Sequence, residues 1–414
     1  MKFTPSSTAW VPALCSAAMA FGSGVVLAQA STGFSNDTVK IGVLTDMSGA
    51  FADLSGAGSV ESVRMAIEDF KAKHKPGFRI EMVSADHQNK ADIGSTKARE
   101  WYDTQGVDMI TDVINSGVAI AVGKVAQQKN RIVMVTGAGT TRLENEDCNA
   151  NTIHYGWDTR TNANGQAKAQ AERGNKSWYF VAVDYALGSS LVQDATEAVA
   201  ATGGVVVGAV KHPLGAADFS SYMLQAKASK AQVIGLANAG SDLINAVKAS
   251  NEFGIAKEQA IAGLVASIID VHSIGLKTAQ GMLVVEDFYW NLNDQTRQWS
   301  RRFFDKQKRM PNFVHAATYS SVLTYLRAVQ AAGTDTAPEV LGQMKRSTIN
   351  DVFATNGKIR EDNKMVHDVY VLEVKKPSES KEPWDYYHVR RTIAAHEASQ
   401  PLSASKCAMV KKPA

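Results

Sequence analysis

The feature that most constrains the fold is a regular alternation of short β-branched runs with amphipathic helical segments. In the first third of the chain, strands are predicted at 39–44, 79–84, 108–114 and 131–135, and helices at 57–74, 91–105 and 118–128. The helix at 57–74 carries apolar residues three or four positions apart, which places them on one buried face: Val60, Val63, Ile67 and Phe70. Strands separated by helices of this length indicate parallel βαβ units.

The same alternation starts again after position 155. Strands are predicted at 177–183, 204–210, 232–236, 259–264 and 281–285, and helices at 189–201, 219–228 and 242–251. A mostly helical segment at 294–332 and two strands, at 369–374 and 386–390, complete the pattern. The sequence therefore predicts two α/β lobes that exchange segments, and 414 residues are enough for two such cores.

A secretory signal peptide is predicted at residues 1–30. Lys2 is the only charged residue before position 37, an apolar run follows at 9–27, and a small-residue cleavage pattern ends at Ala30. The alternative is an uncleaved transmembrane helix, which is disfavoured because Pro12 and Gly22 interrupt the run and no basic cluster follows it. We therefore expect cleavage after Ala30 and a mature protein in the periplasm.

Export changes the interpretation of the three cysteines. Cys15 lies within the predicted signal peptide, so only Cys148 and Cys407 remain in the mature chain. An even number of cysteines in an oxidising compartment predicts a disulfide between them. The alternative is two separate thiols that never meet.

Charge and motif content argue against nucleic-acid binding and against catalysis. Lys plus Arg number 44 and Asp plus Glu 41, a net charge of +3 without the basic excess of a nucleic-acid binder. The mature sequence carries no phosphate-binding loop, no His-Glu-x-x-His, no Cys-x-x-Cys and no convincing Gly-x-Ser-x-Gly. A thiol nucleophile, Cys148 with His154 as its base, is the weaker interpretation of two residues better explained as a disulfide cysteine and a strand histidine. We expect no enzyme activity, metal or cofactor.

Short polar loops follow the predicted strands of both lobes, where parallel sheets bind small ligands. They lie at 46–49, 86–89, 115–117 and 138–141 in the first lobe, and at 184–188, 238–242 and 287–290 in the second. Hydroxyls and free amides at the start of a helix suit a carboxylate or another anion. For any single loop the alternative is an ordinary helix N-cap. Their shared position predicts that some of them line a cleft.

These loops also carry a resemblance. Ile41-Gly42-Val43-Leu44 with Met47-Ser48-Gly49, followed by Asn115-Ser116-Gly117 and Ala138-Gly139-Thr140-Thr141, resembles the periplasmic leucine/isoleucine/valine-type binding proteins of ATP-binding-cassette importers. The likeness continues through Asp184-Tyr185-Ala186-Leu187-Gly188, Asp218-Phe219-Ser220-Ser221 and Asn238-Ala239-Gly240, and covers about residues 37–375. It implies two Rossmann-like lobes with parallel sheets, joined by three crossovers and closing on a ligand. Lobe 1 is then expected at 36–155 plus 285–355, and lobe 2 at 156–284 plus 356–414.

The resemblance also implies a ligand set. Asn115 and Ser116 match the position that meets a ligand carboxylate, while Ala138, Gly139 and Thr140 match a clamp of backbone carbonyl, amide and hydroxyl. The second lobe is expected to contribute Tyr185, Asn238, Asp287 and Phe288. The sequence departs from the family at Leu54 and Leu187, where amino-acid binders carry aromatic residues. Asp287 and Asp270 are candidates for the acid that would meet an ammonium group.

Three functions stay open at this point. The first is capture of an amino acid or a related small carboxylate by a monomer that delivers it to an inner-membrane permease. The second is capture of an aromatic carboxylate, because aromatic residues are frequent in the predicted cleft: Phe51, Trp157, Tyr185, Phe288, Tyr289 and Trp290. The third is an exported ligand receptor for a signalling sensor, which the same fold would serve.

Overall fold

The computed structural model describes Met1 and residues 33–411 of the chain. The predicted cleavage site after Ala30 and Cys15 lie outside the described residues. Residues from Gly33 onward form one unit. Within the described part, no helix combines the length and the apolar composition needed to cross a membrane.

The first series of βαβ units forms a five-stranded parallel sheet in the order β2-β1-β3-β4-β5. Its strands are β1 (Thr38–Thr45), β2 (Arg79–Asp86), β3 (Met109–Asp112), β4 (Ile132–Val135) and β5 (Thr152–His154). Its helices are α1 (Gly56–His74), α2 (Ala91–Thr104) and α3 (Ser116–Gln128). Every residue of β3 and β4 is buried, as expected for central parallel strands covered on both faces. We call this sheet and the helices on it lobe 1.

The second series forms a four-stranded parallel sheet in the order β7-β6-β8-β9. Its strands are β6 (Ser177–Val183), β7 (Val205–His212), β8 (Val233–Ala237) and β9 (Ala260–Gly263). Its helices are α4 (Thr159–Glu172), α5 (Ala186–Ala201), α6 (Ser220–Ala228), α7 (Ser241–Glu252), α8 (Ile268–Ile274) and α9 (Leu276–Ala279). Beside β9 lies β10 (Leu283–Glu286), which pairs antiparallel with β13 (Val369–Val374), and β13 pairs with β14 (Tyr387–Ile393). We call these elements lobe 2.

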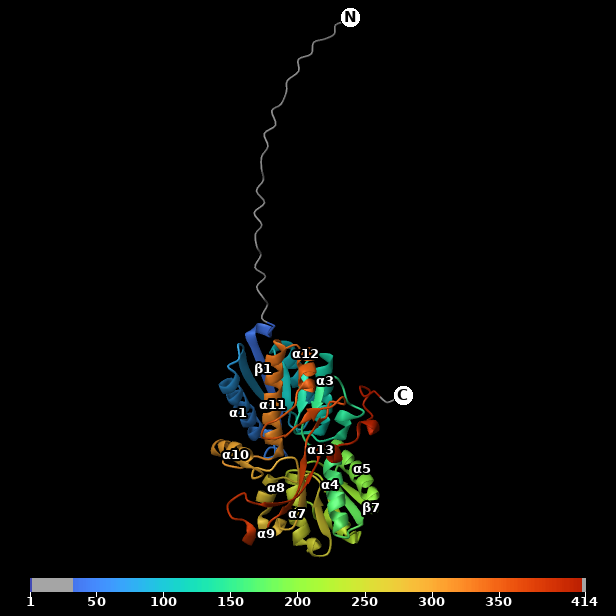
Figure 1. Cartoon of the computed structure of the whole chain (residues 1–414). Helices are drawn as coiled ribbons and strands as arrows, with labels where there is room; N and C mark the ends of the chain where they lie inside the picture. Colours follow the sequence, from blue (N-terminus) through green and yellow to red (C-terminus); the bar gives the residue numbers. More distant parts are fainter. Residues whose placement is uncertain (2–32, 412–414) are drawn as a thin grey trace. The chain divides into compact units, whose positions relative to one another are not determined.

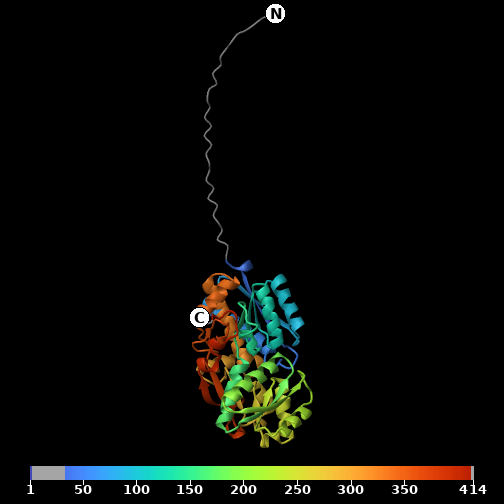
Figure 2. The ribbon, with the colours of Figure 1, turned by 90° about the vertical axis from the view of Figure 1, so that its right-hand side faces the viewer.

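The chain between β10 and β13 returns to lobe 1. It forms α10 (Asp294–Gln307), α11 (Phe313–Ala332), α12 (Ala337–Arg346), β11 (Lys358–Ile359) and β12 (Met365–Val366). Helix α11 is buried along most of its length because it packs on α1, α12 and β3. Figure 1 shows α11 and α12 in orange beside the blue and cyan elements of lobe 1, and Figure 2 shows the same arrangement from the side. The chain thus leaves lobe 2 after β10 and re-enters it at β13.

A disulfide joins Cys148 to Cys407, across 259 positions of sequence, as the cysteine count predicts. The tail reaches this bond after α13 (Ala395–Ala398), which packs on α4 of lobe 2. Beyond α13 the tail contacts lobe 1, where the Ser405 hydroxyl donates to the Glu144 carbonyl at 3.3 Å and the Lys406 amide donates to Asn145 Oδ1 at 2.9 Å. The tail therefore touches both lobes.

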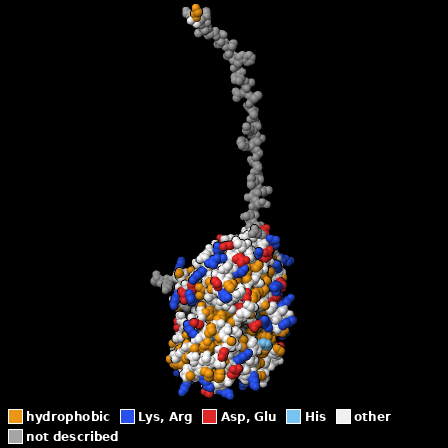
Figure 3. All heavy atoms as spheres, turned by 180° about the vertical axis from the view of Figure 1, so that it is seen from behind, with side chains coloured by type: hydrophobic (Ala, Val, Ile, Leu, Met, Phe, Trp, Pro, Cys, Tyr) orange, Lys and Arg blue, Asp and Glu red, His pale blue; other side chains and the backbone are white. Residues whose placement is uncertain are grey.

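On the molecular face in Figure 3, Lys and Arg side chains are interspersed with Asp and Glu side chains. This distribution agrees with the near balance of charges in the sequence and gives that face no continuous basic field of the kind that binds nucleic acid.

Candidate ligand-binding site

The N-terminus of α3 presents a buried serine hydroxyl. Asn115 caps the helix, because its side-chain oxygen accepts hydrogen bonds from the amides of Gly117 at 2.9 Å and Val118 at 3.2 Å. Ser116 follows and is 1% exposed, and its hydroxyl oxygen has no hydrogen-bond partner within the described chain. A buried hydroxyl at a helix N-terminus is a favourable contact for an anionic group.

The loop that follows β4 is the second part of the site in lobe 1. The Ala138 carbonyl accepts a hydrogen bond from His154 Nε2 at 3.0 Å, and the Thr140 hydroxyl lies 2.7 Å from the Ser190 hydroxyl of lobe 2. Among the described residues, none accepts a hydrogen bond from the amides of Ala138, Gly139 or Thr140. A β-carbon at Gly139 would lie 2.4 Å from the Trp157 ring, so this close approach requires glycine. The loop thus offers amide donors in a rigid setting.

Further contacts join the two lobes. The Ser241 amide at the start of α7 donates to the Ala50 carbonyl of lobe 1 at 3.2 Å, and the Thr141 hydroxyl donates to Asp194 on α5 at 3.1 Å. Gly240 has a φ of +59°, and a β-carbon there would lie 2.3 Å from the Ala50 carbonyl oxygen. The lobes are therefore in direct contact at Ala50, Thr140 and Thr141 of lobe 1.

Lobe 2 contributes buried polar groups that lack partners within the described residues. Tyr185 stands at the N-cap of α5, and its hydroxyl is one of these groups. Asn238 follows β8; its side-chain nitrogen lies 3.0 Å from His212 Nε2, while its oxygen is unpartnered. Asp242 on α7 has one unpartnered oxygen, and burial raises its pKa to about 6. The charge of Asp242 acts on Tyr185, so these two residues are neighbours.

Two residues with a buried, unpartnered oxygen, Asp242 of lobe 2 and Asn89 of lobe 1, are absent from the ligand set that the sequence implies. Asp242 lies in the loop predicted at 238–242, and Asn89 lies in the loop predicted at 86–89. The Asn89 side-chain oxygen is unpartnered, while its nitrogen donates to Asp46 at 2.7 Å. The position of these loops at the ends of strands was the signal that locates them. The choice of residue within each loop depends on side-chain direction, which no sequence pattern gives here.

Asp46 organises the loop after β1 instead of facing a ligand. It is fully buried and accepts hydrogen bonds from the amides of Gly49 at 2.7 Å and Phe51 at 2.9 Å, in addition to the Asn89 side chain. Both of its oxygens are therefore used within lobe 1.

Residues 287–290, which follow β10 where the chain leaves lobe 2, are buried. Asp287 is 2% exposed, its Oδ2 lies 3.6 Å from His367 Nε2, and neither oxygen has a hydrogen-bond partner among the described residues. Phe288 packs edge-to-face on Trp299 with ring centres 5.7 Å apart. The Trp290 indole donates to the Trp384 carbonyl at 2.8 Å. These aromatic rings fill the protein core.

Asp270, the other candidate partner for an ammonium group, forms a capping box with Ser267, the N-cap residue of α8. It accepts hydrogen bonds from the amide and the hydroxyl of Ser267, each at 2.8 Å, and burial raises its pKa to about 7.

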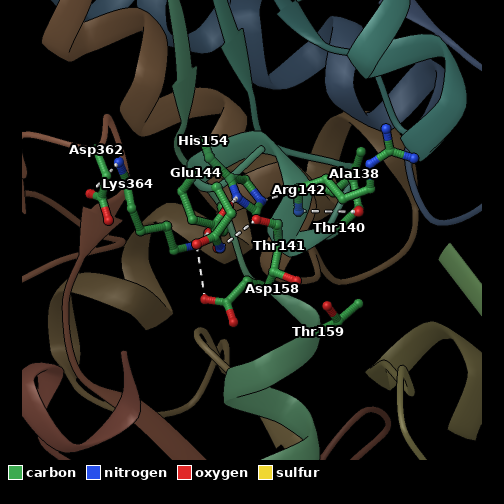
Figure 4. Close-up of polar contacts among 12 residues, drawn as sticks. Ala138, Thr140, Thr141, Arg142, Glu144, His154, Asp158, Thr159, Asp362 and Lys364 are labelled. Atoms are coloured by element: carbon green, nitrogen blue, oxygen red, sulfur yellow. Dashed lines mark hydrogen bonds and ion pairs between the residues drawn. The ribbon is translucent and has the colours of Figure 1, made fainter. Parts of the chain in front are cut away.

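A buried polar network lies behind the 138–141 loop (Figure 4). His154 Nδ1 is hydrogen-bonded to Glu144, and burial raises the pKa of Glu144. Lys364 pairs with Asp158 at 3.2 Å and donates to the Gly156 carbonyl. Burial acts to raise the pKa of Asp158, but the Lys364 ammonium and hydrogen bonds from Thr161 outweigh it, so this pKa lies below its ordinary range.

These contacts also settle the weaker interpretation of Cys148 and His154. Cys148 is oxidised in the disulfide, and both ring nitrogens of His154 are engaged, one by Glu144 and one by the Ala138 carbonyl. The two residues therefore do not form a thiol–imidazole pair.

A groove of about 640 Å³ opens beside the interlobe contacts. Its lining comes from lobe 1, α4, α5 and the C-terminal tail, and includes Thr141, Arg142, Tyr185, Ser190, Asp194 and Lys406. Because Tyr185 and Ser190 belong to both, this groove is continuous with the site described above.

Two parallel α/β sheets, segments exchanged between lobes and polar loops meeting at the strand ends define a two-lobed binding protein. Residues 38–381 match the family described as periplasmic binding protein, and the chain belongs to this family. The resemblance inferred from the strand-end loops is thereby confirmed.

Individual relatives agree with this assignment. A periplasmic binding protein from Burkholderia mallei is 48% identical, with a TM-score of 0.89 over 91% of this chain and 100% of that one. A branched chain amino acid ABC transporter periplasmic ligand-binding protein from Burkholderia xenovorans LB400 is 39% identical, with a TM-score of 0.80 over 90% of this chain and 100% of that one. A Leu/Ile/Val-binding protein homolog 6 of Brucella abortus (strain 2308) is 28% identical over 201 residues, 47% of this chain. The match spans 50% of that relative's length.

Proposed function

We propose that this protein is the extracytoplasmic solute-binding component of an ABC transporter and captures a small carboxylate when its lobes close. The observation that carries the proposal is the set of buried donors in lobe 1, the Ser116 hydroxyl and the unused amides of 138–140, at an interface where Ser190 of lobe 2 reaches Thr140. The donors lie on lobe 1 and are covered by lobe 2. An anion that binds them contacts both lobes only in the closed state, and therefore favours that state.

The ligand class that we favour is an amino acid or a related small carboxylate. The Burkholderia xenovorans relative supports a carboxylate, since its name assigns it to branched chain amino acids. An aromatic carboxylate is the second candidate, favoured by the unpartnered Tyr185 hydroxyl and by the buried Phe51 and Trp157 beside the contact loops. We also propose that the protein is a monomer, that it delivers its ligand to an inner-membrane permease, and that it has no enzyme activity. An exported receptor for a sensor remains the alternative, which an adjacent sensor-kinase gene would favour.

Calorimetric titration of matched serine variants tests the proposal once a thermal-shift screen of amino acids and aromatic acids has identified a binding carboxylate. Removing a hydroxyl that bonds a charged group costs about 1.5–3 kcal/mol, so Ser116→Ala is expected to weaken binding by about ten-fold or more. Ser300→Ala is the control, because Ser300 on α10 is also buried with an unpartnered hydroxyl. Equal affinities for both variants would remove Ser116 from the site, and a screen in which only sugars or metal ions bind would refute the carboxylate itself.

A further inference from the structure

We propose that lobe 2 carries a second ligand site, a groove between α4 and the sheet β10-β13-β14 that binds a small amphipathic anion. This inference goes beyond the proposed function and does not depend on it. The groove has a volume of about 380 Å³, and the volumes of ligand pockets begin at about 300 Å³. None of the residues that form the interlobe contacts described above lines this groove. It is therefore separate from the site between the lobes.

The floor of the groove is apolar. Leu283 of β10, Val371 of β13 and Ile393 of β14 line it, and all three are buried. Opposite them α4 presents Gly165 and Ala169, which are small enough to leave the space between helix and sheet open. Val371 and Ile393 belong to a small apolar cluster that is separate from the main core, and Ala169 packs against it. The floor thus offers a surface on which an apolar chain is buried.

A β-bulge in β14 brings two adjacent arginines to the rim of the groove. Successive residues of a regular strand point to opposite faces of a sheet. Val371 pairs with Arg391 and Leu372 pairs with Val389, so Arg390 is the extra residue of a bulge. Arg390 and Arg391 accordingly both line the groove, whereas regular pairing would send one of them to the other face. The bulge therefore concentrates two positive charges on this side of the sheet.

The cations at the rim outnumber the carboxylates that pair with them. Glu373 Oε2 meets both Arg173, at 3.7 Å, and Arg390, at 2.8 Å. Glu397 Oε1 likewise meets both Lys168 and Arg391. Hydrogen bonds and charge from Lys168 and Arg391 lower the pKa of Glu397, as an excess of positive charge does. The rim as a whole joins four cations to three carboxylates: Lys168, Arg173, Arg390 and Arg391 with Glu172, Glu373 and Glu397.

An apolar floor under a cationic rim fits an apolar chain or ring that ends in one anionic head. A guanidinium has five N–H donors, and the ion pairs at the rim use one or two of them, so donors remain for a further anion. These pairs are partly exposed to solvent, and such pairs rearrange at little cost. The volume of the groove suits one short chain and is too small for the two long chains of a membrane lipid.

Calorimetric titration with octanoate, 1-octanol and octylammonium tests the proposal, because these probes share one chain and differ in the charge of the head. Octanoate is expected to bind about ten-fold or more tightly than the other two. Ala169→Leu fills the floor and is expected to weaken octanoate binding by about ten-fold or more. Ala171→Leu is the matched control, since it makes the same change on α4 at a residue that does not line the groove.

The rim is tested by Arg390→Gln/Arg391→Gln. The ratio of the octanoate affinity to the 1-octanol affinity is expected to fall about ten-fold, while the 1-octanol affinity itself stays unchanged. A general disturbance of the groove would instead weaken both probes together. Arg301→Gln/Arg346→Gln removes two exposed arginines elsewhere and is expected to keep the wild-type ratio.

Octanoate is itself a carboxylate, so Ser116→Ala separates the groove from the site between the lobes. Octanoate binding that Ser116→Ala weakens and Ala169→Leu leaves intact would overturn the proposal, and so would octylammonium binding as tightly as octanoate. Phosphatidylglycerol vesicles that bind through Arg390 and Arg391, with no binding of octanoate, would assign the rim to a membrane surface instead. If Ala169→Leu does not fold, nitrogen-15 NMR of wild type with octanoate decides. Shifts of the Ala169 and Ile393 amides support the groove, and shifts confined to 116 and 138–140 refute it.

Discussion

At the scale of single residues, the interlobe carboxylate Asp194 predicts a pH dependence of stability. It is 5% exposed, accepts hydrogen bonds from Thr159 at 2.5 Å and Thr141 at 3.1 Å, and burial raises its pKa to about 7. The ordinary pKa is about 3.9. The folded state therefore binds the proton more tightly than the unfolded state. Its contribution to the free energy of unfolding is complete below pH 4 and is lost as the pH rises to about 7.

Urea unfolding at pH 4.5, 6 and 8 checks this prediction. At about 1.4 kcal/mol for each pH unit, the contribution of Asp194 has an upper bound of about 4 kcal/mol across this range. Asp194→Asn is expected to be more stable than wild type at pH 8 and to show a flatter pH profile. Asp184→Asn serves as the control, because Asp184 is exposed and pairs with Lys211 on the surface. Identical profiles for wild type and Asp194→Asn would contradict the prediction.

The residues of the site were predictable from sequence to different degrees. Ser116 and residues 138–140 follow predicted strands, where the order of the polar loops locates them. In the structure Ser116 begins the capped helix α3, and Thr140 contacts Ser190 of lobe 2. Phe288 stays a predicted ligand residue, and the structure shows it packed edge-to-face on Trp299. Aromatic composition cannot tell a core ring from a ligand-facing ring, because both are apolar and the direction of the side chain is set by packing. His154 was interpreted as a strand histidine, and its contact with Ala138 arises only when β5 pairs with β4.

At the scale of elements, we expect that one added methyl group at the start of α7 would hinder closure of the two lobes. Gly240→Ala places a β-carbon within 2.3 Å of the Ala50 carbonyl of lobe 1, in addition to the strain of a φ of +59°. Gly254→Ala is the matched control, because Gly254 has a φ of +65° and a β-carbon added there would meet no atom within 4 Å. Both variants are expected to lose about 1 kcal/mol of stability.

Only Gly240→Ala is expected to weaken ligand binding, by about ten-fold or more, and to keep a larger radius of gyration at ligand saturation. Small-angle scattering and calorimetry on the two variants measure both quantities. Equal affinity and equal compaction in the two variants would show that the contact between Gly240 and Ala50 does not take part in closure.

The elements themselves follow the sequence where periodicity is strong. β6 and β13 have the predicted bounds, and α3 begins two residues early because Asn115 caps it. Helix α4 was not predicted. Its buried positions are Thr, Asn, Ala, Gly and Gln, so no apolar stripe marks it. Small residues suit its place, since a β-carbon at Gly165 would lie 2.6 Å from Val285 of β10. Helix α8 has seven residues, too short for an apolar period to be recognised.

At the scale of the whole molecule, the tail adds a covalent connection between the lobes to the three crossing segments. On lobe 2, the Ala398 carbonyl accepts a hydrogen bond from the Thr161 hydroxyl at 3.1 Å, and Glu397 pairs with Lys168 at 3.0 Å. On lobe 1, Cys407 is bonded to Cys148. Any motion that separates the lobes must therefore be compatible with a tail of about ten residues fixed at both of its ends.

Cys148→Ser/Cys407→Ser is accordingly expected to lower stability and to widen the ligand-free ensemble. The disulfide closes a loop of 259 positions, for which the chain-entropy model gives on the order of 5–6 kcal/mol at most. Denaturant unfolding measures the stability, and small-angle scattering without ligand measures the radius of gyration. The radius is expected to increase in the double variant and in wild type treated with a reductant, while ligand saturation returns both to the closed value. Leu402→Ala, a substitution in the tail that leaves the disulfide intact, is the control and is expected to match wild type in radius. A double variant that is less stable but has the wild-type radius without ligand would mean that the tail stabilises the fold without limiting how far the lobes open.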